Sequence, residues 1–204
     1  MHKALEVFNE NIEAAKQSGG IYQYLSESVV GPISFDDLLR SQLVNAVSAF
    51  DKLIHDLVRI GIVQTYLGQR AATPKYLSEP ISIQVHTDLV AASIPPKEFV
   101  FEQAIIKKLK VVSYQEPGKV AEGLSYIWSE SQKWQKISAA MSDTENNVKT
   151  TLKLIADRRN AIVHEADTDP LTNGRLAISK AECDKVADFL QLCGNSIAGL
   201  VSIA

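Results

Sequence analysis

Helical periodicity runs through almost the whole chain and is the feature that most restricts how it can fold. Its strongest instance begins at Ser34, a good N-cap residue, and places Asp36 and Asp37 in the first turn, where the helix dipole favours anions. From there to about residue 67, apolar residues recur every three or four positions, as on one face of a helix: Leu39, Leu43, Ala46, Val47, Phe50, Leu53, Ile54, Leu57 and Val58. The sequence has no convincing pair of strands, so we predict an all-α fold.

The same periodicity predicts further helices over residues 1–18, 82–92, 97–113, 119–140, 143–165 and from about 180 onward. Gly19 and Gly20 are expected to end the first of these helices. Two capping boxes of the form Ser-x-x-Glu, at Ser142 and Ser179, are expected to open the last two. The prediction is an irregular helical bundle of about five to seven helices.

Length and composition place the chain in the ordinary globular class. It has 204 residues, of which 46% are hydrophobic, so we expect one domain covering residues 1–204. Its net charge of −3 provides no general attraction to nucleic acid or to an anionic membrane. No apolar run is long enough to span a membrane, and Cys183 and Cys193 are too few for a disulfide framework. We therefore expect a cytoplasmic protein with reduced thiols.

One charged residue lies where the pattern calls for an apolar one. In the predicted helix 143–165 an apolar stripe runs through Val148, Leu152 and Ile155 to Ile162, and Arg159 occupies the position that completes it. Burying an unpaired charge is costly, so Arg159 must have a partner, line a cleft or face another subunit.

Two polar residues follow Arg159 on the same helix. Asn160 and His164 are four residues apart and share one face, whereas Arg159 and His164 are separated by roughly 140° around the helix axis. A single helix would not aim both Arg159 and His164 at one phosphate, but two copies crossing near a two-fold axis would bring them together.

Structural roles are open for the same residues. Arg159 could be a buried member of an ion pair with Asp51, Asp56 or Asp157. His164 could interact with the dipole at the end of its helix. The Arg-x4-His spacing alone does not decide between these roles and a functional site.

The string Arg159-Asn160-Ala161-Ile162-Val163-His164 resembles the signature of HEPN domains, in which an arginine, a polar residue and a histidine lie near the end of a helix. The wider sequence RRNAIVHEAD is similar to the RiboL-PSP branch of that superfamily, and so is the upstream segment 44–58. The resemblance implies a core at about residues 36–66 and 143–204, with residues 68–140 as an insertion of helices and loops. HEPN domains are all-α and usually dimeric.

The resemblance also implies an activity. Many HEPN domains are metal-independent endoribonucleases of bacterial toxin–antitoxin or phage-defence systems. Carried over by position, the catalytic residues would be Arg159 and His164, with Asn160 assisting, and Asp51 and His55 from the upstream helix would support them. The implied partners are RNA, a second copy of the chain and a cognate antitoxin protein, with no membrane and no cofactor.

These residue types suit RNA cleavage without a metal. A histidine can exchange a proton near neutral pH, and an arginine can hold phosphate oxygens through two parallel hydrogen bonds. The four histidines show no spacing typical of zinc ligands, so no metal site is expected. Two alternatives remain open: a catalytically inactive HEPN module that binds RNA or nucleotide or scaffolds a partner, and a plain helical interaction domain in which Arg159 is an ion-pair member.

Overall fold

A computed structural model describes residues 1–169 and 171–202. The all-α prediction is confirmed, since these residues form helices with one isolated β-bridge between Thr168 and Arg175. The described ranges contain nine helices, more than the five to seven expected: α1 (His2–Ser28), α2 (Asp36–Tyr66), α3 (Pro74–Leu77), α4 (Ile83–Ala91), α5 (Lys97–Leu109), α6 (Pro117–Leu124), α7 (Lys133–Ala140), α8 (Glu145–His164) and α9 (Lys180–Ser202).

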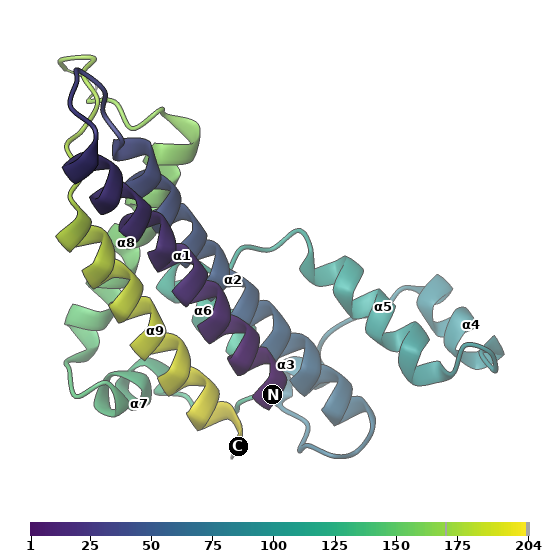
Figure 1. Cartoon of the computed structure of the whole chain (residues 1–204). Helices are drawn as coiled ribbons and strands as arrows, with labels where there is room; N and C mark the ends of the chain where they lie inside the picture. The colour runs from purple at the N-terminus through teal and green to yellow at the C-terminus, as the bar shows by residue number, and fades with distance from the viewer. Residues whose placement is uncertain (170, 203–204) are drawn as a thin grey trace.

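The long helices α1, α2 and α9 form the centre of the bundle (Figure 1). α2 packs against both α1 and α9 and buries an apolar face along its length, including Phe50, Leu53 and Leu57. Phe8 and Ile12 of α1 and Leu190 and Ile197 of α9 close around this face. Burial of side chains of this size is worth roughly 1.5–3 kcal/mol each, so this three-helix contact contributes strongly to stability.

The first helix is longer than predicted. Gly19 and Gly20 do not end it, and α1 continues to Ser28. Gly19 is buried against α2, and a Cβ added there would lie 2.3 Å from Oε1 of Gln42. The glycine therefore permits close packing of two helices.

Two other local predictions differ from the structure. The expected helix over residues 119–140 is divided into α6 and α7, and the segment between them carries Ile127 into the core against Gly61. The capping box at Ser142 does not form, because Ser142 has a left-handed backbone (φ 56°) and Thr144 is the N-cap, accepting from the backbone N of Asn147. The box at Ser179 is confirmed: Ser179 and Glu182 each accept the other's backbone N–H.

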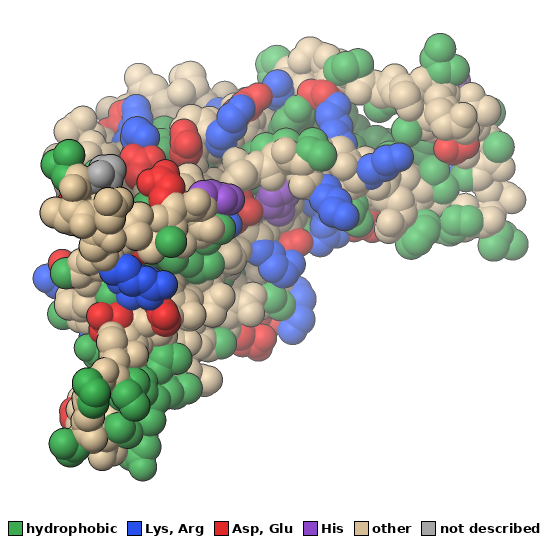
Figure 2. Space-filling view, turned by 90° about the horizontal axis from the view of Figure 1, so that it is seen from above, with side chains coloured by type: hydrophobic (Ala, Val, Ile, Leu, Met, Phe, Trp, Pro, Cys, Tyr) green, Lys and Arg blue, Asp and Glu red, His purple; other side chains and the backbone are tan. Residues whose placement is uncertain are grey.

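Helices α4 and α5 extend sideways from the bundle as an arm (Figure 1). α5 packs on α2, whereas α4 packs mainly on α5 and has no buried residue. Figure 2 shows hydrophobic side chains gathered at the outer end of the molecule formed by this arm, and Ile83, Val90 and Ile94 are exposed there. The division into a core at residues 36–66 and 143–204 and an insertion at 68–140 stays a prediction.

Both cysteines lie on α9 as free thiols and are buried in the core of the bundle. Burial raises the pKa of Cys183 to about 11 and that of Cys193 to about 12, so both are protonated and unreactive at neutral pH. None of the described helices is long and apolar enough to cross a membrane.

Two glycines of α9 provide a matched test of this packing. A Cβ at Gly194 would lie 2.5 Å from the ring of Phe8 and 2.9 Å from Cδ2 of Leu53, whereas a Cβ at Gly199 would meet nothing within 4 Å. We expect Gly194→Ala to lower the free energy of unfolding by about 1–3 kcal/mol through overpacking. Gly199→Ala should raise it by about 0.5–1 kcal/mol through helix propensity. Urea denaturation measures both, and equal effects of the two substitutions would contradict the packing described.

Candidate functional site at the end of α8

The last two turns of α8 carry the residues singled out in the sequence. The buried face of this helix ends at Ile155 and Ala156, and beyond them Arg159 and Ile162 are only partly buried. The expected apolar stripe therefore runs out of the core before it reaches Arg159. The end of α8 is positioned by the segment that connects α8 to α9.

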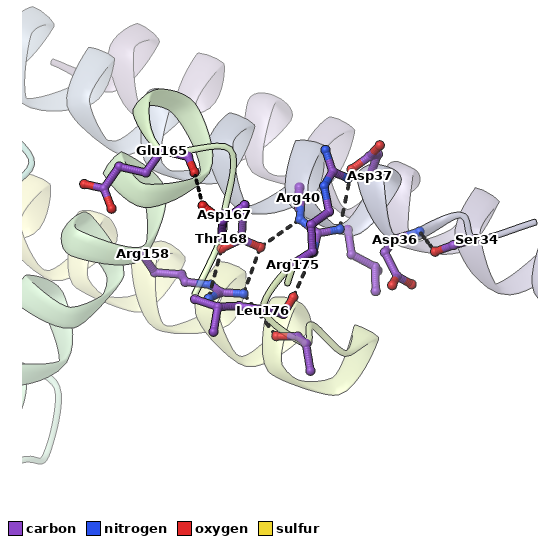
Figure 3. Close-up of polar contacts among 12 residues, drawn as sticks. Ser34, Asp36, Asp37, Arg40, Arg158, Glu165, Asp167, Thr168, Arg175 and Leu176 are labelled. Carbon is purple, nitrogen blue, oxygen red and sulfur yellow. Dashed lines mark hydrogen bonds and ion pairs between the residues drawn. The ribbon is translucent and has the colours of Figure 1, made fainter. Parts of the chain in front are cut away.

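A buried carboxylate fixes that connection. Asp167 is fully buried with a left-handed backbone (φ 56°), and its carboxylate lies between Arg40 of α2 and Arg158 of α8 (Figure 3). Nε of Arg40 donates to Oδ2 at 2.8 Å, and Arg158 donates to Oδ2 at 3.0 Å and lies 3.0 Å from Oδ1. Two positive guanidinium groups thus hold one buried negative charge, an arrangement in which the attraction can offset the desolvation cost.

The same arginines also hold the backbone of the connection. Arg40 donates to the carbonyl of Leu176 at 2.8 Å, and Arg158 donates to that of Ala177 at 3.0 Å. The backbone N–H of Asp167 donates to the carbonyl of Ala161 at 3.0 Å. This hydrogen bond closes the last turn of α8, which carries His164. We call Arg40, Arg158 and Asp167 the Asp167 clamp.

This clamp was not predicted from the sequence, although the sequence carries signals of it. Arg40 lies between Leu39 and Leu43, beside the apolar face of α2, where a charge needs a partner. Arg158 precedes Arg159, and only the structure separates the roles of the two adjacent arginines.

Arg159 has no ion pair among the residues that the structure describes. Its Nε is buried and has no hydrogen-bond partner there, and its Nη1 donates to Oδ1 of Asn160 at 3.1 Å. The three carboxylates considered as its partners are occupied elsewhere: Asp157 pairs with Lys153, Asp56 pairs with Lys52 and Arg59, and Asp51 accepts from the backbone of Tyr114. The ion-pair interpretation of Arg159 therefore has no support from these contacts.

His164 occupies the last turn of α8 and is exposed. In residues 1–169 and 171–202 no side chain forms a hydrogen bond or an ion pair with it. The structure thus places Arg159 and Asn160 in contact and leaves the imidazole of His164 open to solvent. Figure 2, which views the molecule from above, shows histidine side chains at the surface with both basic and acidic side chains near them.

Asp51 and His55 lie together in the middle of α2. Nε2 of His55 is 3.0 Å from the carbonyl oxygen of Val112 and 3.9 Å from Oδ2 of Asp51, and its ring centroid is 4.6 Å from that of Tyr114. The pair lines a surface hollow of about 490 Å³ together with Lys52 and Lys110. Within one protomer no hydrogen bond or ion pair of the described part joins this pair to Arg159, Asn160 or His164.

In the described part of the chain, no three His, Cys, Asp or Glu side chains gather closely enough to hold a metal ion. Arg159, Asn160 and His164 bring one guanidinium, one amide and one imidazole to the last turns of α8.

An all-α bundle with Arg-Asn-x3-His in the last turns of a helix is the arrangement of an HEPN domain. The sequence profile of the RiboL-PSP-HEPN family matches residues 9–202, nearly the whole chain, and the protein therefore belongs to that family. The match includes most of α1 and all of residues 68–140. Neither the curated proteins nor the solved structures contain a significant match. The HEPN superfamily includes ribonucleases, and its domains often form dimers and bind RNA.

The clamp makes a stability prediction. Asp167→Ala leaves the Arg40 and Arg158 charges without their carboxylate, and we expect the free energy of unfolding to fall by about 3–5 kcal/mol. Asp157→Ala is the control, because the exposed pair of Asp157 with Lys153 is worth less than about 1 kcal/mol. Denaturant unfolding compares the two variants, and an Asp167 variant as stable as the Asp157 variant would show that the clamp contributes little.

Proposed function

We propose that the protein is a metal-independent endoribonuclease that acts as a homodimer, with Arg159, His164 and Asn160 at its active site. The observation that carries the proposal is that two adjacent arginines differ in their hydrogen bonds and ion pairs. Arg158 is fully committed to Asp167 and Ala177, whereas Arg159 has no ion pair among the described residues and a buried Nε without a partner. A charged group in that state is suited to an anionic ligand, and a phosphodiester supplies one.

The chemistry follows from the groups present. The imidazole of His164 takes the proton from a ribose 2′-hydroxyl, and the 2′-oxygen attacks the adjacent phosphorus. The bond from phosphorus to the 5′-oxygen breaks, that oxygen takes a proton from water, and the imidazolium of His164 returns its proton to the solvent. Arg159 stabilises the additional negative charge on the phosphorane, and Asn160 orients the guanidinium through the contact with its Nη1. The products are a 2′,3′-cyclic phosphate and a 5′-hydroxyl, and DNA is spared because it lacks the nucleophile.

The helix geometry favours the participation of a second protomer. Arg159 and His164 project about 140° apart around α8, so one copy of the helix does not direct both side chains at one phosphate. Two copies of α8 related by a two-fold axis would place Arg159 of one protomer beside His164 of the other. In the proposed dimer, Asp51 and His55 act from α2 by fixing the orientation of the arginine or the tautomer of the catalytic histidine.

The cellular role is proposed from family membership. The enzyme acts in the cytoplasm as a toxin or phage-defence effector and is restrained by a cognate antitoxin protein. It uses no cofactor.

The test is cleavage of single-stranded RNA in the presence of EDTA. We expect His164→Ala to lower the rate by about 10²–10⁴-fold, the usual contribution of a general acid or base. His86→Ala is the matched control, because His86 lies on α4, away from the motif. Gel electrophoresis and the end groups of the products report the reaction.

Two results would contradict the proposal. A His164→Ala variant that is folded and fully active would remove the histidine from the mechanism. A wild-type protein that binds RNA without cutting it would instead be the catalytically inactive HEPN module.

A further inference from the structure

A second hollow, remote from the motif, lies between the bundle and the arm. It has a volume of about 280 Å³, close to the lower end of the range for small-ligand sites, roughly 300–1,000 Å³. Its walls come from α2, from the segment containing α3, from α4 and α5, and from the turn after α6. The lining is mostly apolar and aromatic, and the residues used below are Tyr66, Tyr76, Glu79, Phe101, Lys108 and Tyr126. We call it the arm cavity.

Aromatic rings form its walls. The rings of Tyr66 and Phe101 are stacked, with centroids 4.2 Å apart and an interplanar angle of 15°. Burial raises the pKa of Tyr76, and it also raises that of Tyr126, so both phenols stay neutral and keep their protons. Flat aromatic walls favour a flat aromatic ligand, because ring faces gain stacking energy beyond simple burial.

One corner of the arm cavity is polar and charged. The carboxylate of Glu79 accepts a hydrogen bond from the hydroxyl of Tyr126 and forms an ion pair with Lys108. Burial alone would raise the pKa of Glu79, but the hydrogen bonds from Lys108 and Tyr126 hold it below its ordinary value, and the group is an anion. The ammonium of Lys108 also donates to the carbonyl of Pro80 at 3.4 Å, which leaves one of its three donors. A carboxylate can accept about four hydrogen bonds, so the corner keeps free acceptors on Glu79 beside one free donor of Lys108.

We propose that the arm cavity binds a guanine base. The Watson–Crick edge of guanine presents two adjacent donors, N1–H and the N2 amino group, next to the O6 acceptor. The two donors match the carboxylate of Glu79, and O6 matches the ammonium of Lys108. Adenine offers one donor beside an acceptor on that edge, so it leaves the carboxylate partly unsatisfied.

The base can come from a free guanine nucleotide or from an unpaired guanosine of an RNA strand. Binding of the free nucleotide is independent of the proposed ribonuclease activity. The RNA source rests on that proposed function, and in that case the arm cavity selects the strand to be cut.

The experiment measures binding of guanosine, inosine and adenosine 5′-monophosphates to the full-length protein by calorimetry. Inosine lacks only the N2 amino group of guanine, so it tests the contact with Glu79 without any change to the protein. We expect guanosine monophosphate to bind at least about tenfold more tightly than either of the other two nucleotides, because loss of one hydrogen-bonded contact to a base lowers the affinity by about that factor. Equal binding of the guanosine and adenosine nucleotides would overturn the proposal.

A matched pair of variants locates the site. Glu79→Gln should weaken guanosine monophosphate binding at least about tenfold. Glu98→Gln, the same change at an exposed position of the arm outside the cavity, should leave it unchanged. Thermal unfolding establishes that both variants are folded, and a Glu79→Gln variant that binds like the wild type would also overturn the proposal.

Short RNAs that carry a single guanosine or inosine, tested on His164→Ala protein, distinguish the two sources. Displacement of the guanosine RNA by guanosine monophosphate supports an RNA base, and binding of the mononucleotide alone supports a free nucleotide. Because these measurements report binding, loss of guanine selectivity with intact cleavage contradicts only the arm cavity. Guanine binding without any cleavage contradicts only the ribonuclease.

Discussion

The buried carboxylate of Asp167 is the interaction on which the candidate site depends. It joins three elements of the chain, because Arg40 belongs to α2, Arg158 belongs to α8, and Asp167 itself belongs to the segment that leads to α9. Without it, Arg158 would have no carboxylate partner among the described residues and Arg40 would keep only Asp37, 3.4 Å away, and loss of the partner of a buried charge is costly in a low-dielectric environment. The clamp fixes the end of α8 three residues before Asp167, at His164.

Because of this arrangement, two adjacent arginines of α8 have different contacts. Arg158 is bound to the buried Asp167, whereas Arg159, which contacts Asn160, is the arginine that we propose binds the phosphate. The neighbouring face of α8 ends in an exposed imidazole. A rigid helix whose end is tied by buried charges is a suitable support for such groups, because catalytic side chains must be held close to their productive geometry. The arm is joined to this core through α5, which buries Phe101, Ile105 and Leu109, whereas α4 has no buried residue.

The sequence alone predicted much of this fold. The long apolar face of α2 and the stripe on α8 reflect burial in a single core, so helical periodicity located α2, α4, α8 and α9 closely. The errors occurred where tertiary contacts override local signals. Gly19 is a packing residue that faces Gln42, and the segment after α6 leaves the helical path to bring Ile127 against Gly61.

The sequence predicted only part of the candidate site. A charge on an apolar stripe identified Arg159 as unusual, and the motif identified His164. The Asp167 clamp was missed because its partners Arg40 and Asp167 are 127 residues apart in sequence, and no local pattern connects such positions. The arm cavity was missed for the same reason, since Glu79, Lys108 and Tyr126 approach one another only through the packing of the arm.

The central claim is that Arg159 and His164 of different protomers form one active site, and a mixing experiment tests it most directly. Arg159→Ala and His164→Ala proteins are each expected to be inactive alone. Co-refolded in equal amounts, half of the dimers should be mixed, and each mixed dimer should contain one complete site, so the RNA cleavage rate should recover to roughly a quarter of the wild-type rate. A mixture that stays as inactive as either variant alone, while mixed dimers form, would contradict a site shared between protomers.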